Sequence, residues 1–372
     1  MKIPFVDLKT QYISIKNDID SAIKSVILDT AFIGGTNNHY VKIFEEQFAS
    51  YLKINYCISC ANGTDALEIL LRAYGISEGD EVIVPALTWI STSEAVNLVG
   101  AKPVFVDILP NYYTINPAKI EEKINKKTKA IIPVHLYGMP AEMDEIISIA
   151  KKYKLIVIED CAQAHGAEYK GQKVGTIGHA GSFSFYPGKN LGAYGDSGCM
   201  VTNDKNIADR ARMITNHGQI KKHEHQIIGR NSRMDGIQAA ILIVKLAYLN
   251  QWIKNRINNA RFYDKYFFES KIETPSTPEY SKHAFHLYVI QTDYRNKINS
   301  LLKKNQIATG IHYPTPLPFL KVYSHNNYIP SDFPVAYEAS NKILSLPMFP
   351  ELEEAQIKYI TDVIKSYFSK YE

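Results

Sequence analysis

The chain has 372 residues, of which 45% are hydrophobic and 22% charged, and a net charge of +4. This composition is typical of a globular protein with room for one large and one smaller domain, and the scattered lysines argue against a nucleic-acid-binding protein. No apolar stretch approaches the ~20 residues that span a membrane, and the N-terminus lacks the apolar core of a signal peptide. We therefore expect a cytoplasmic protein with no nucleic-acid or membrane partner.

Two helices are predicted before the first strand, at 16–28 and 41–52. From residue 81 on, continuous apolar segments alternate with amphipathic ones. The apolar segments predict strands at 81–85, 103–108, 130–138, 155–160, 180–187 and 198–204. The amphipathic segments predict helices at 89–100, 116–124 and 142–153. This alternation predicts an α/β fold with a mainly parallel sheet, helices on both faces and ligands at the carboxyl ends of the strands.

The pattern changes after about residue 240. A long helical run at 237–267 is followed by a strand at 283–291, a helix near 294–304, a loop at 308–318 and a C-terminal helix near 353–370. We interpret this part as a smaller α/β domain. The predicted division is a large domain over 1–240, with the N-terminal helical segment, and a smaller domain over 241–372.

Cys57 and Cys60 form a CxxC pair, which can indicate redox or metal chemistry. No second pair and no nearby histidine pair completes a zinc site. We therefore interpret both as small apolar residues of a buried strand, and expect no metal.

The segment 61–75 places Asn62, Gly63 and Thr64 between a strand and an amphipathic helix. Free N–H groups and the helix dipole at such a point favour a phosphate, and glycine allows the backbone to approach it closely. Thr64 could equally serve only as the N-cap of the helix.

A second motif follows the predicted strand at 155–160, which ends in Glu159 and Asp160. A carboxylate after four apolar residues needs a cationic partner or water. A protonated pyridine nitrogen would be such a partner, although Asp160 could also cap the following turn. His165 either orients Asp160 by a hydrogen bond or is a structural histidine.

The third motif is the glycine-rich segment 181–204, in which Lys189 follows a strand of alternating Ser and Phe. A lysine in a partly dry pocket has a lowered pKa, which favours Schiff-base chemistry. Ser184, five residues earlier, offers a hydroxyl that could reach a phosphate of the same cofactor.

Taken together, these motifs resemble the DegT/DnrJ-type sugar aminotransferases, which have the fold type I of pyridoxal-phosphate (PLP) enzymes. The resemblance covers nearly the whole chain and rests on several separate segments in the right order. They are PFVDL (4–8), FEEQFASYL (44–52), NGTDAL (62–67), VPALTWISTSEAV (84–96), EDCAQAHGA (159–167), FSFYPGKNLGAYGD (183–196), GRNSRMDGIQAA (229–240) and TGIHYPTPLP (309–318).

The resemblance implies that PLP is the cofactor and that pyridoxamine phosphate is its intermediate form. Lys189 would be the catalytic residue, bound to PLP as a Schiff base and later moving a proton. Asp160 would bind the pyridine nitrogen, Gln163 would lie near the phenolic oxygen, and Trp89 would stack on the ring.

The phosphate contacts follow from the same resemblance. Gly63, Thr64, Asp65 and Ser184 are expected on the cofactor, with the first two and the serine holding its phosphate. Asn231 would reach the phosphate across a dimer interface. The resemblance therefore implies a homodimer with shared active sites.

The implied reaction has two halves: L-glutamate gives its amino group to the cofactor, which then aminates a ketone of a nucleotide-linked sugar. The Tyr-Pro-x-Lys-Asn-Leu-Gly pattern at 186–192 resembles enzymes that aminate C3. We therefore expect a dTDP-3-keto-6-deoxyhexose as substrate and a dTDP-3-amino-3,6-dideoxyhexose as product. Tyr186, His312 and Tyr313 are candidates for lining the sugar pocket, the alternative being ordinary loop packing.

Other readings stay open at this point. The substrate could be a 3-keto UDP-sugar or a 4-keto-6-deoxy sugar nucleotide. Family members that catalyse 3-dehydration carry histidine in place of the Schiff-base lysine, and Lys189 argues against that reading. A non-catalytic regulatory protein on the same fold is the alternative from a different class.

Overall fold

The computed structural model describes residues 1–35 and 38–371. Within these residues, a seven-stranded sheet has the order β1-β9-β8-β5-β4-β2-β3. Its strands are β1 (Tyr56–Cys60), β2 (Glu81–Pro85), β3 (Lys102–Val106), β4 (Thr128–Ile131), β5 (Ile156–Asp160), β8 (Ala180–Ser184) and β9 (Gly198–Thr202). Only β9 runs antiparallel to its neighbours, so the other six described strands of this sheet point the same way. The predicted mainly parallel sheet is confirmed.

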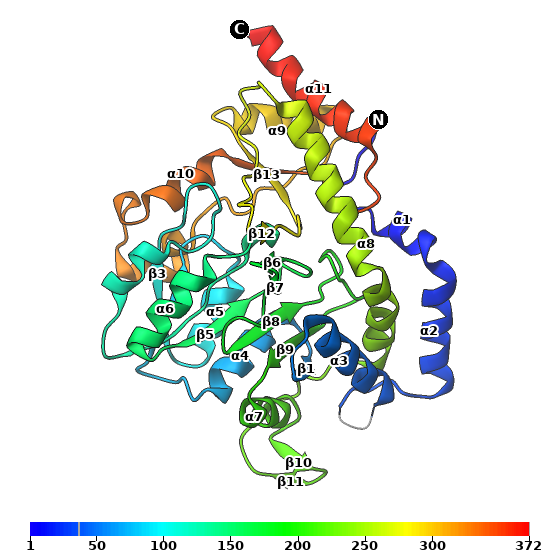
Figure 1. Ribbon diagram of the computed structural model, residues 1–372, viewed down its shortest axis with the longest axis vertical. Coiled ribbons are helices and arrows are strands. Elements are labelled where there is room, and N and C mark those ends of the chain that lie inside the picture. Colours follow the sequence, from blue (N-terminus) through cyan, green and yellow to red (C-terminus); the bar gives the residue numbers. More distant parts are fainter. Residues whose placement is uncertain (36–37, 372) are drawn as a thin grey trace.

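Helices cover both faces of this sheet (Figure 1). Successive strand residues point to opposite faces, so Ile158 packs with the helices of one face while Val157 packs with those of the other. The Ile158 face carries α4 (Gly63–Ala73), α5 (Ser91–Leu98) and α7 (Lys205–Thr215). The opposite face carries α3 (His39–Leu52), α6 (Met143–Tyr153) and part of α8 (Gly236–Phe267). The sheet is therefore buried on both sides, which explains its continuous apolar strands.

The long helix α8 runs from the sheet to the C-terminal part of the chain (Figure 1). There β13 (Tyr288–Gln291) pairs antiparallel with β14 (Ile343–Leu346). The helices of this part are α9 (Arg295–Lys304), α10 (Pro334–Lys342) and α11 (Glu354–Tyr371). Ile3 packs in the same apolar cluster as α9 and α11, so the first residues of the chain join this part. The predicted boundary at 240/241 falls inside α8, and the two-domain division stays a prediction.

The remaining elements are short. The N-terminal helices are α1 (Leu8–Ser14) and α2 (Lys16–Leu28). Two small sheets contain β6 (Glu168–Tyr169), β7 (Gln172–Lys173) and β12 (Ser281–Lys282), and β10 (Gln219–Lys221) with β11 (Glu224–His225). The 3₁₀ turns are η1 (Pro117–Lys119), η2 (Glu121–Lys123), η3 (Leu136–Gly138), η4 (Leu317–Phe319), η5 (Lys321–Asn326) and η6 (Pro330–Asp332).

Three sequence-based elements differ from the structure. The helix predicted at 116–124 is the pair of turns η1 and η2. The strand predicted at 130–138 ends at Ile131, because Pro133 has no N–H for a ladder and the chain then turns into η3. The strand predicted at 283–291 begins only at Tyr288, since the N–H groups of Ala284 and Leu287 donate to the turn at 137–138 instead.

Helix α8 also has the length and apolar content to cross a membrane. Half of its most apolar window is buried inside the protein, and core helices of non-membrane proteins meet the same criterion. Its buried side chains pack against α2, α3 and α11, so it acts here as the central helix that joins the two parts of the chain.

Candidate active site

The functional side chains gather at one edge of the sheet because six strands end there together. Asp160 is the last residue of β5 and Ser184 the last of β8, while β1 leads directly into Asn62 and α4. A cavity of about 700 Å³ opens at this edge. It is lined by Asn62, Gly63, Thr64, Asp65, Leu67, Thr88, Trp89, Ser91, Thr92, Glu94, Leu98, Val134, Asp160, Ala162, Gln163, Ser184, Tyr186, Lys189, Asp196 and Tyr313.

Lys189 lies in the turn that follows β8, where its N–H donates to the Tyr186 carbonyl at 2.9 Å. Burial lowers the pKa of its amine from 10.5 to about 8, and the nearby Asp160 carboxylate opposes that shift. An amine with such a pKa is unprotonated in roughly a tenth of molecules at pH 7, against well under a thousandth for an ordinary lysine. Lys189 is therefore a nucleophile that faces an open cavity.

Asp160 is almost fully buried at the end of β5. Its Oδ2 accepts a hydrogen bond from Thr92 Oγ1 at 2.9 Å, and its Oδ1 accepts one from the Ala162 N–H at 3.1 Å. Burial raises the pKa of this carboxyl, while the two hydrogen bonds and Lys189 act in the opposite direction. Asp160 thus both caps the turn, as one reading had it, and presents a carboxylate that a cation in the cavity would stabilise.

His165 does not orient Asp160. Its ring packs against Phe183 and Phe185, with centroids 5.4 and 5.6 Å away, and the described hydrogen bonds of the Asp160 carboxylate come from other groups. Burial lowers the pKa of His165 to about 3, so it is a neutral ring in the core beneath the site. The structural reading of this histidine is the one that fits.

A cradle for a phosphate lies where α4 begins. Asn62, not Thr64, caps the helix, by accepting the Asp65 N–H at 2.8 Å. A Cβ on Gly63 would stand 2.6 Å from the Cβ of Ser184, so only glycine lets the two segments approach this closely. The Thr64 hydroxyl donates to Ser91 at 2.7 Å. The helix start, Gly63 and two hydroxyls therefore converge on one point of the cavity.

An aromatic wall closes another side. The rings of Trp89 and Tyr313 lie 5.7 Å apart, and the Tyr313 hydroxyl accepts a hydrogen bond from Gln163 Nε2 at 2.9 Å. The Tyr137 N–H donates to Gln163 Oε1 at 2.7 Å, so both ends of this amide are held. Gln163 and Tyr313 are thereby fixed in place, whereas Trp89 is 56% exposed at the rim.

Not every predicted site residue lies in the cavity. Tyr186 is at the mouth and 58% exposed, while His312 lies behind the wall, with its Nδ1 2.8 Å from Ser345 Oγ. Asn231 is exposed and outside the cavity of its own chain. Asp65 does line the cavity, but its carboxylate accepts a hydrogen bond from the Ser232 hydroxyl at 2.6 Å.

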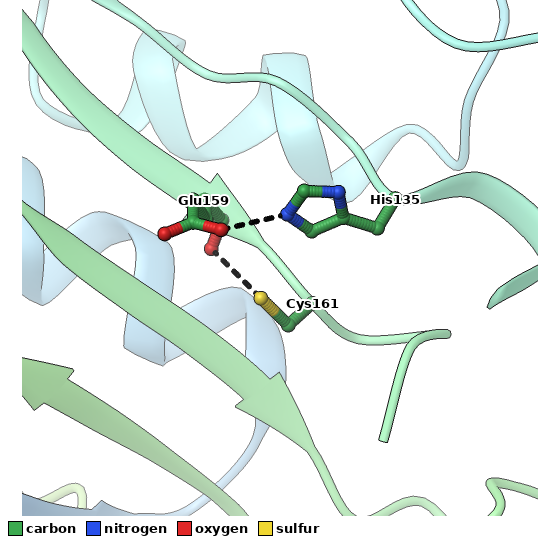
Figure 2. Close-up of side chains that lie close together, drawn as sticks. All are labelled: His135, Glu159 and Cys161. Carbon is green, nitrogen blue, oxygen red and sulfur yellow. Dashed lines mark hydrogen bonds and ion pairs between the residues drawn. The ribbon is translucent and has the colours of Figure 1, made fainter. Parts of the chain in front are cut away.

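Figure 2 shows a second polar cluster, of His135, Glu159 and Cys161, two of which are the chain neighbours of Asp160. The Glu159 carboxylate accepts three backbone N–H groups, from 175, 177 and 178, at 2.6–2.7 Å. His135 accepts the Ala141 N–H at Nδ1, so its Nε2 donates to Glu159 at 2.9 Å. Because the polar atoms of His135 and Glu159 are hydrogen-bonded within the protein, we interpret the cluster as a structural support for the end of β5 and not as a metal site.

The comparisons with known proteins agree with this geometry. The model of the DegT/DnrJ/EryC1/StrS aminotransferase family matches residues 14–365. The chain belongs to this family. Its members similar to this chain include the dTDP-3-amino-3,6-dideoxy-α-D-galactopyranose transaminase of Aneurinibacillus thermoaerophilus, 42% identical over 98% of this chain and 99% of that protein. The "pleiotropic regulatory protein" of Geobacillus stearothermophilus is 43% identical over 99% of both chains.

Solved structures of the DegT/DnrJ/EryC1/StrS family have the same fold. DesV of S. venezuelae, solved with a ketimine intermediate, has a TM-score of 0.96 and is 37% identical over 100% of both chains. NtdA of Bacillus subtilis, solved with pyridoxamine phosphate, has a TM-score of 0.89 and is 33% identical over 98% of this chain and 85% of that one. The protein is therefore a PLP-dependent aminotransferase, and the predicted fold, family and cofactor are confirmed.

The residues of the cavity fit PLP. The lowered pKa of Lys189 suits an amine that bonds an aldehyde, and Asp160 offers the anionic partner that a pyridine nitrogen needs. The glycine at the start of α4 lets Ser184 pack directly against it, which brings a hydroxyl next to the helix N–H groups that favour a phosphate. Each group of the cofactor thus has a chemically matched counterpart in the cavity.

Sequence reasoning missed three residues of this site. Thr92 binds the Asp160 carboxylate, Ser91 binds Thr64, and the backbone of Tyr137 holds Gln163. The two hydroxyls follow Trp89 within three residues, in a segment that already carried the family resemblance. A hydroxyl at the start of a helix has too many ordinary uses for its sequence to indicate this one. Tyr137 gives no sequence signal, because its contribution is a backbone N–H.

Proposed function

We propose that the protein transfers the amino group of L-glutamate to C3 of a dTDP-3-keto-6-deoxyhexose, giving a dTDP-3-amino-3,6-dideoxyhexose. The observation that carries the proposal is the joint presence of Lys189 and Asp160 in one cavity. The name of the Aneurinibacillus relative gives the sugar class, and the pattern Tyr186-Pro187-x-Lys189 agrees with C3 amination.

The roles of the residues follow from their positions. Bound PLP supplies an electron sink for the carbanion formed at the donor Cα. Lys189 Nζ would take the proton from that Cα and deliver it to C4′ of the cofactor, and would move a proton the opposite way when the sugar is aminated. A group with a pKa near the working pH is suited to both transfers. Asp160 keeps positive charge on the ring nitrogen, since the buried carboxylate gains most from a cationic neighbour.

The phosphate is assigned to Gly63, Thr64 and Ser184, which meet at the start of α4. The aromatic wall holds the ring face, with Trp89 stacking and Gln163 near the phenolic oxygen. Tyr186 and Tyr313 line the outer part of the cavity, where the sugar would enter. The ring of His312 is hydrogen-bonded to Ser345 and does not line the cavity. His312 therefore stays a sugar-pocket candidate only because it adjoins Tyr313 in the chain.

A homodimer with shared active sites belongs to the same proposal. Asn231 is exposed and outside the cavity of its own chain, so it can hold a phosphate only in another copy. Trp89 and Tyr186, both more than half exposed at the mouth, leave that mouth open in a single chain. A partner that covers it would exclude water from the reacting atoms.

Incubation with a panel of keto-sugar nucleotides tests the substrate. The purified protein, PLP and L-glutamate are combined with dTDP-3-keto, dTDP-4-keto and UDP-3-keto sugars, and products are identified by NMR. We expect a 3-amino sugar from the dTDP-3-keto substrate, with kcat/KM at least about tenfold above the others, as about 1.4 kcal/mol of discrimination gives. Preference for a UDP-sugar would overturn the nucleotide part only.

The UDP alternative rests on another relative, a UDP-N-acetyl-3-dehydro-α-D-glucosamine 3-aminotransferase of Acidithiobacillus ferrooxidans, 42% identical over 98% of this chain and 97% of that protein. The regulatory alternative rests on the name of the Geobacillus relative. A sample that binds PLP, links it to Lys189 permanently on borohydride reduction and turns over no sugar in the panel would favour regulation over catalysis.

A further inference from the structure

The segment around Asn231 is held on both sides by one carboxylate. Arg230 Nη2 lies 3.0 Å from Asp65 Oδ1, and the Ser232 hydroxyl donates to Asp65 Oδ2 at 2.6 Å. Asn231, between them, is exposed. The two flanking side chains therefore point inward to the same acid, while the amide of Asn231 points outward, as alternate residues of an extended chain do. We call Arg230, Asp65 and Ser232 the clasp.

The backbone of this segment is fixed as well. The Arg230 N–H donates to the Ile214 carbonyl at 2.8 Å, and the Ser232 N–H donates to the Thr215 carbonyl at 2.9 Å. Both carbonyls belong to the end of α7, which packs on α4. Side chains and backbone thus fix the chain on both sides of Asn231, and its amide oxygen accepts a hydrogen bond from Arg233 Nε at 3.2 Å.

The interactions of the clasp occupy both oxygens of the Asp65 carboxylate. Both of its oxygens have partners, and a second acid one turn later, Glu68, also binds Arg230. Arg72 takes the other oxygen of Glu68 at 2.9 Å. Both oxygens of Asp65 thus serve to anchor the segment, in addition to the cofactor contact that the family resemblance implied for this residue.

We propose that Arg230 and Ser232 are positioning residues that, through Asp65, hold Asn231 in place for the active site of the partner subunit. The inference rests on the proposed shared-site dimer. On this proposal the start of α4 contributes to two active sites. Gly63 and Thr64 bind the cofactor of their own chain, while Asp65 holds the segment whose Asn231 binds the cofactor of the partner subunit. A side chain held in its bound geometry loses less entropy when it binds, which is the physical gain from such a clasp.

Mixed dimers separate this role from a local structural one. Two tagged copies of the chain are co-expressed, and dimers with one of each are purified. Lys189→Ala in one copy leaves a single Lys189 per dimer. The visible absorbance of lysine-bound PLP then reports on one active site only. That site takes Asn231 from the copy that carries Lys189→Ala.

In the first pairing, Arg230→Met is placed on the Lys189→Ala copy, which donates Asn231. In the second pairing, it is placed on the other copy, which provides the lysine. We expect PLP affinity to fall about fivefold or more in the first pairing and to stay at the reference value in the second. A loss in the second pairing only, or an equal loss in both, would overturn the proposal.

Asn231→Ala in the same two pairings keeps this inference distinct from the proposed dimer. Loss in the first pairing only supports the shared site. If Asn231→Ala acts this way and Arg230→Met does not, the clasp alone is wrong. If Asn231→Ala has no effect in either pairing, the shared site fails and the clasp proposal fails with it.

Two further variants guard against misfolding, because Arg230→Met leaves Asp65 without its cation and Glu68 with Arg72 alone. Ser232→Ala removes one hydrogen bond of the clasp and keeps every charge, and it should give the same pattern with a loss of about threefold. Arg72→Gln is the matched control, since it also removes an arginine from Glu68 but leaves the clasp. It should leave PLP affinity unchanged in both pairings, and thermal unfolding checks that each dimer is folded.

Discussion

Two desolvated lysines of this protein, the half-buried Lys189 and the fully buried Lys245, have similarly lowered pKa values and different surroundings. Burial lowers the pKa of both Lys189 and Lys245 to about 8. Lys189 faces a cavity of about 700 Å³, and its amine has no hydrogen bond to the residues that the structure describes. Lys245, on α8, donates to the Gly192 carbonyl at 2.7 Å and lies over the Tyr194 ring.

The difference shows that a lowered pKa does not by itself mark a reactive lysine. Desolvation acts on both amines, but the ammonium of Lys245 is bonded and enclosed by side chains. Lys189 has room in front of it and a carboxylate within electrostatic reach. Open space and an unused lone pair, added to the lowered pKa, are what make a nucleophile.

The largest effect is expected from a matched pair of lysine substitutions. Lys189→Met removes the group that bonds PLP and moves the proton, so transamination should fall at least about a thousandfold. Lys245→Met leaves the Gly192 carbonyl unpaired, at a cost of about 1–3 kcal/mol of stability, with kcat/KM within about tenfold of wild type. Steady-state kinetics and thermal unfolding of both variants measure this. Comparable loss of activity in the two would break the comparison.

Next in size is the adjacent pair of acids at the end of β5. Asp160→Asn removes the anionic partner of the ring nitrogen, and kcat should fall by at least about a hundredfold with the fold intact. Glu159→Gln sets an amide against backbone N–H donors and should lower the melting temperature, with a smaller effect on kcat. A mild kinetic effect of Asp160→Asn would mean that this acid only caps its turn.

A smaller effect is expected at the phosphate cradle. Gly63→Ala would push a Cβ to within 2.6 Å of Ser184, so the cradle must open and PLP affinity should fall about tenfold. Gly188→Ala is the matched control in the lysine turn, because its nearest neighbour would be an ordinary 3.6 Å away. PLP titration of the two apoproteins compares them, and equal affinities would count against the cradle.

The rate of PLP capture should depend on pH. Lys189 reacts as the free amine, and its pKa is about 8. Below that pH, the reactive fraction and hence the capture rate should fall about tenfold for each pH unit. Above it, the rate should level off. Stopped-flow absorbance of the apoprotein with PLP measures the profile; Lys245→Met should leave it unchanged, and a midpoint near 10.5 would show that burial does not tune Lys189.

The smallest expected effect is on stability. The pKa of Lys245 is lowered on folding, so between about 8 and the ordinary 10.5 the unfolded chain holds more protons than the folded one. Stability therefore rises with pH through this window, and Lys245→Met should remove part of that rise. Thermal unfolding of the apoprotein at a series of pH values tests it. An unchanged slope would show that Lys245 does not titrate there.

The sequence by itself determined the fold class and the family, and it predicted that the candidate reactive residues share one edge of the sheet. Apolar strands are local patterns, and the predicted strand 155–160 does end in Asp160, whereas the predicted strand 180–187 ends earlier, at Ser184. Parallel strands bring their carboxyl ends to one edge whatever the details of packing. Lys189 follows the end of β8 by only five residues and therefore had to lie at the same edge. The fold class and the position of the site could be predicted because they depend only on the periodicity of apolar residues and on the direction of the chain.

Only the tertiary structure decided which way individual side chains face. The carboxylate of Asp65 binds Arg230 and Ser232, and the ring of His312 binds Ser345. These partners are distant in the sequence, and the bonds to them orient both side chains. Lys245 is one of several lysines on a helix in the sequence, and only its burial against Gly192 distinguishes it. The physical reason is that a hydrogen bond is chosen by distance in space, and residues 65 and 230 become neighbours only after the sheet and α7 have packed.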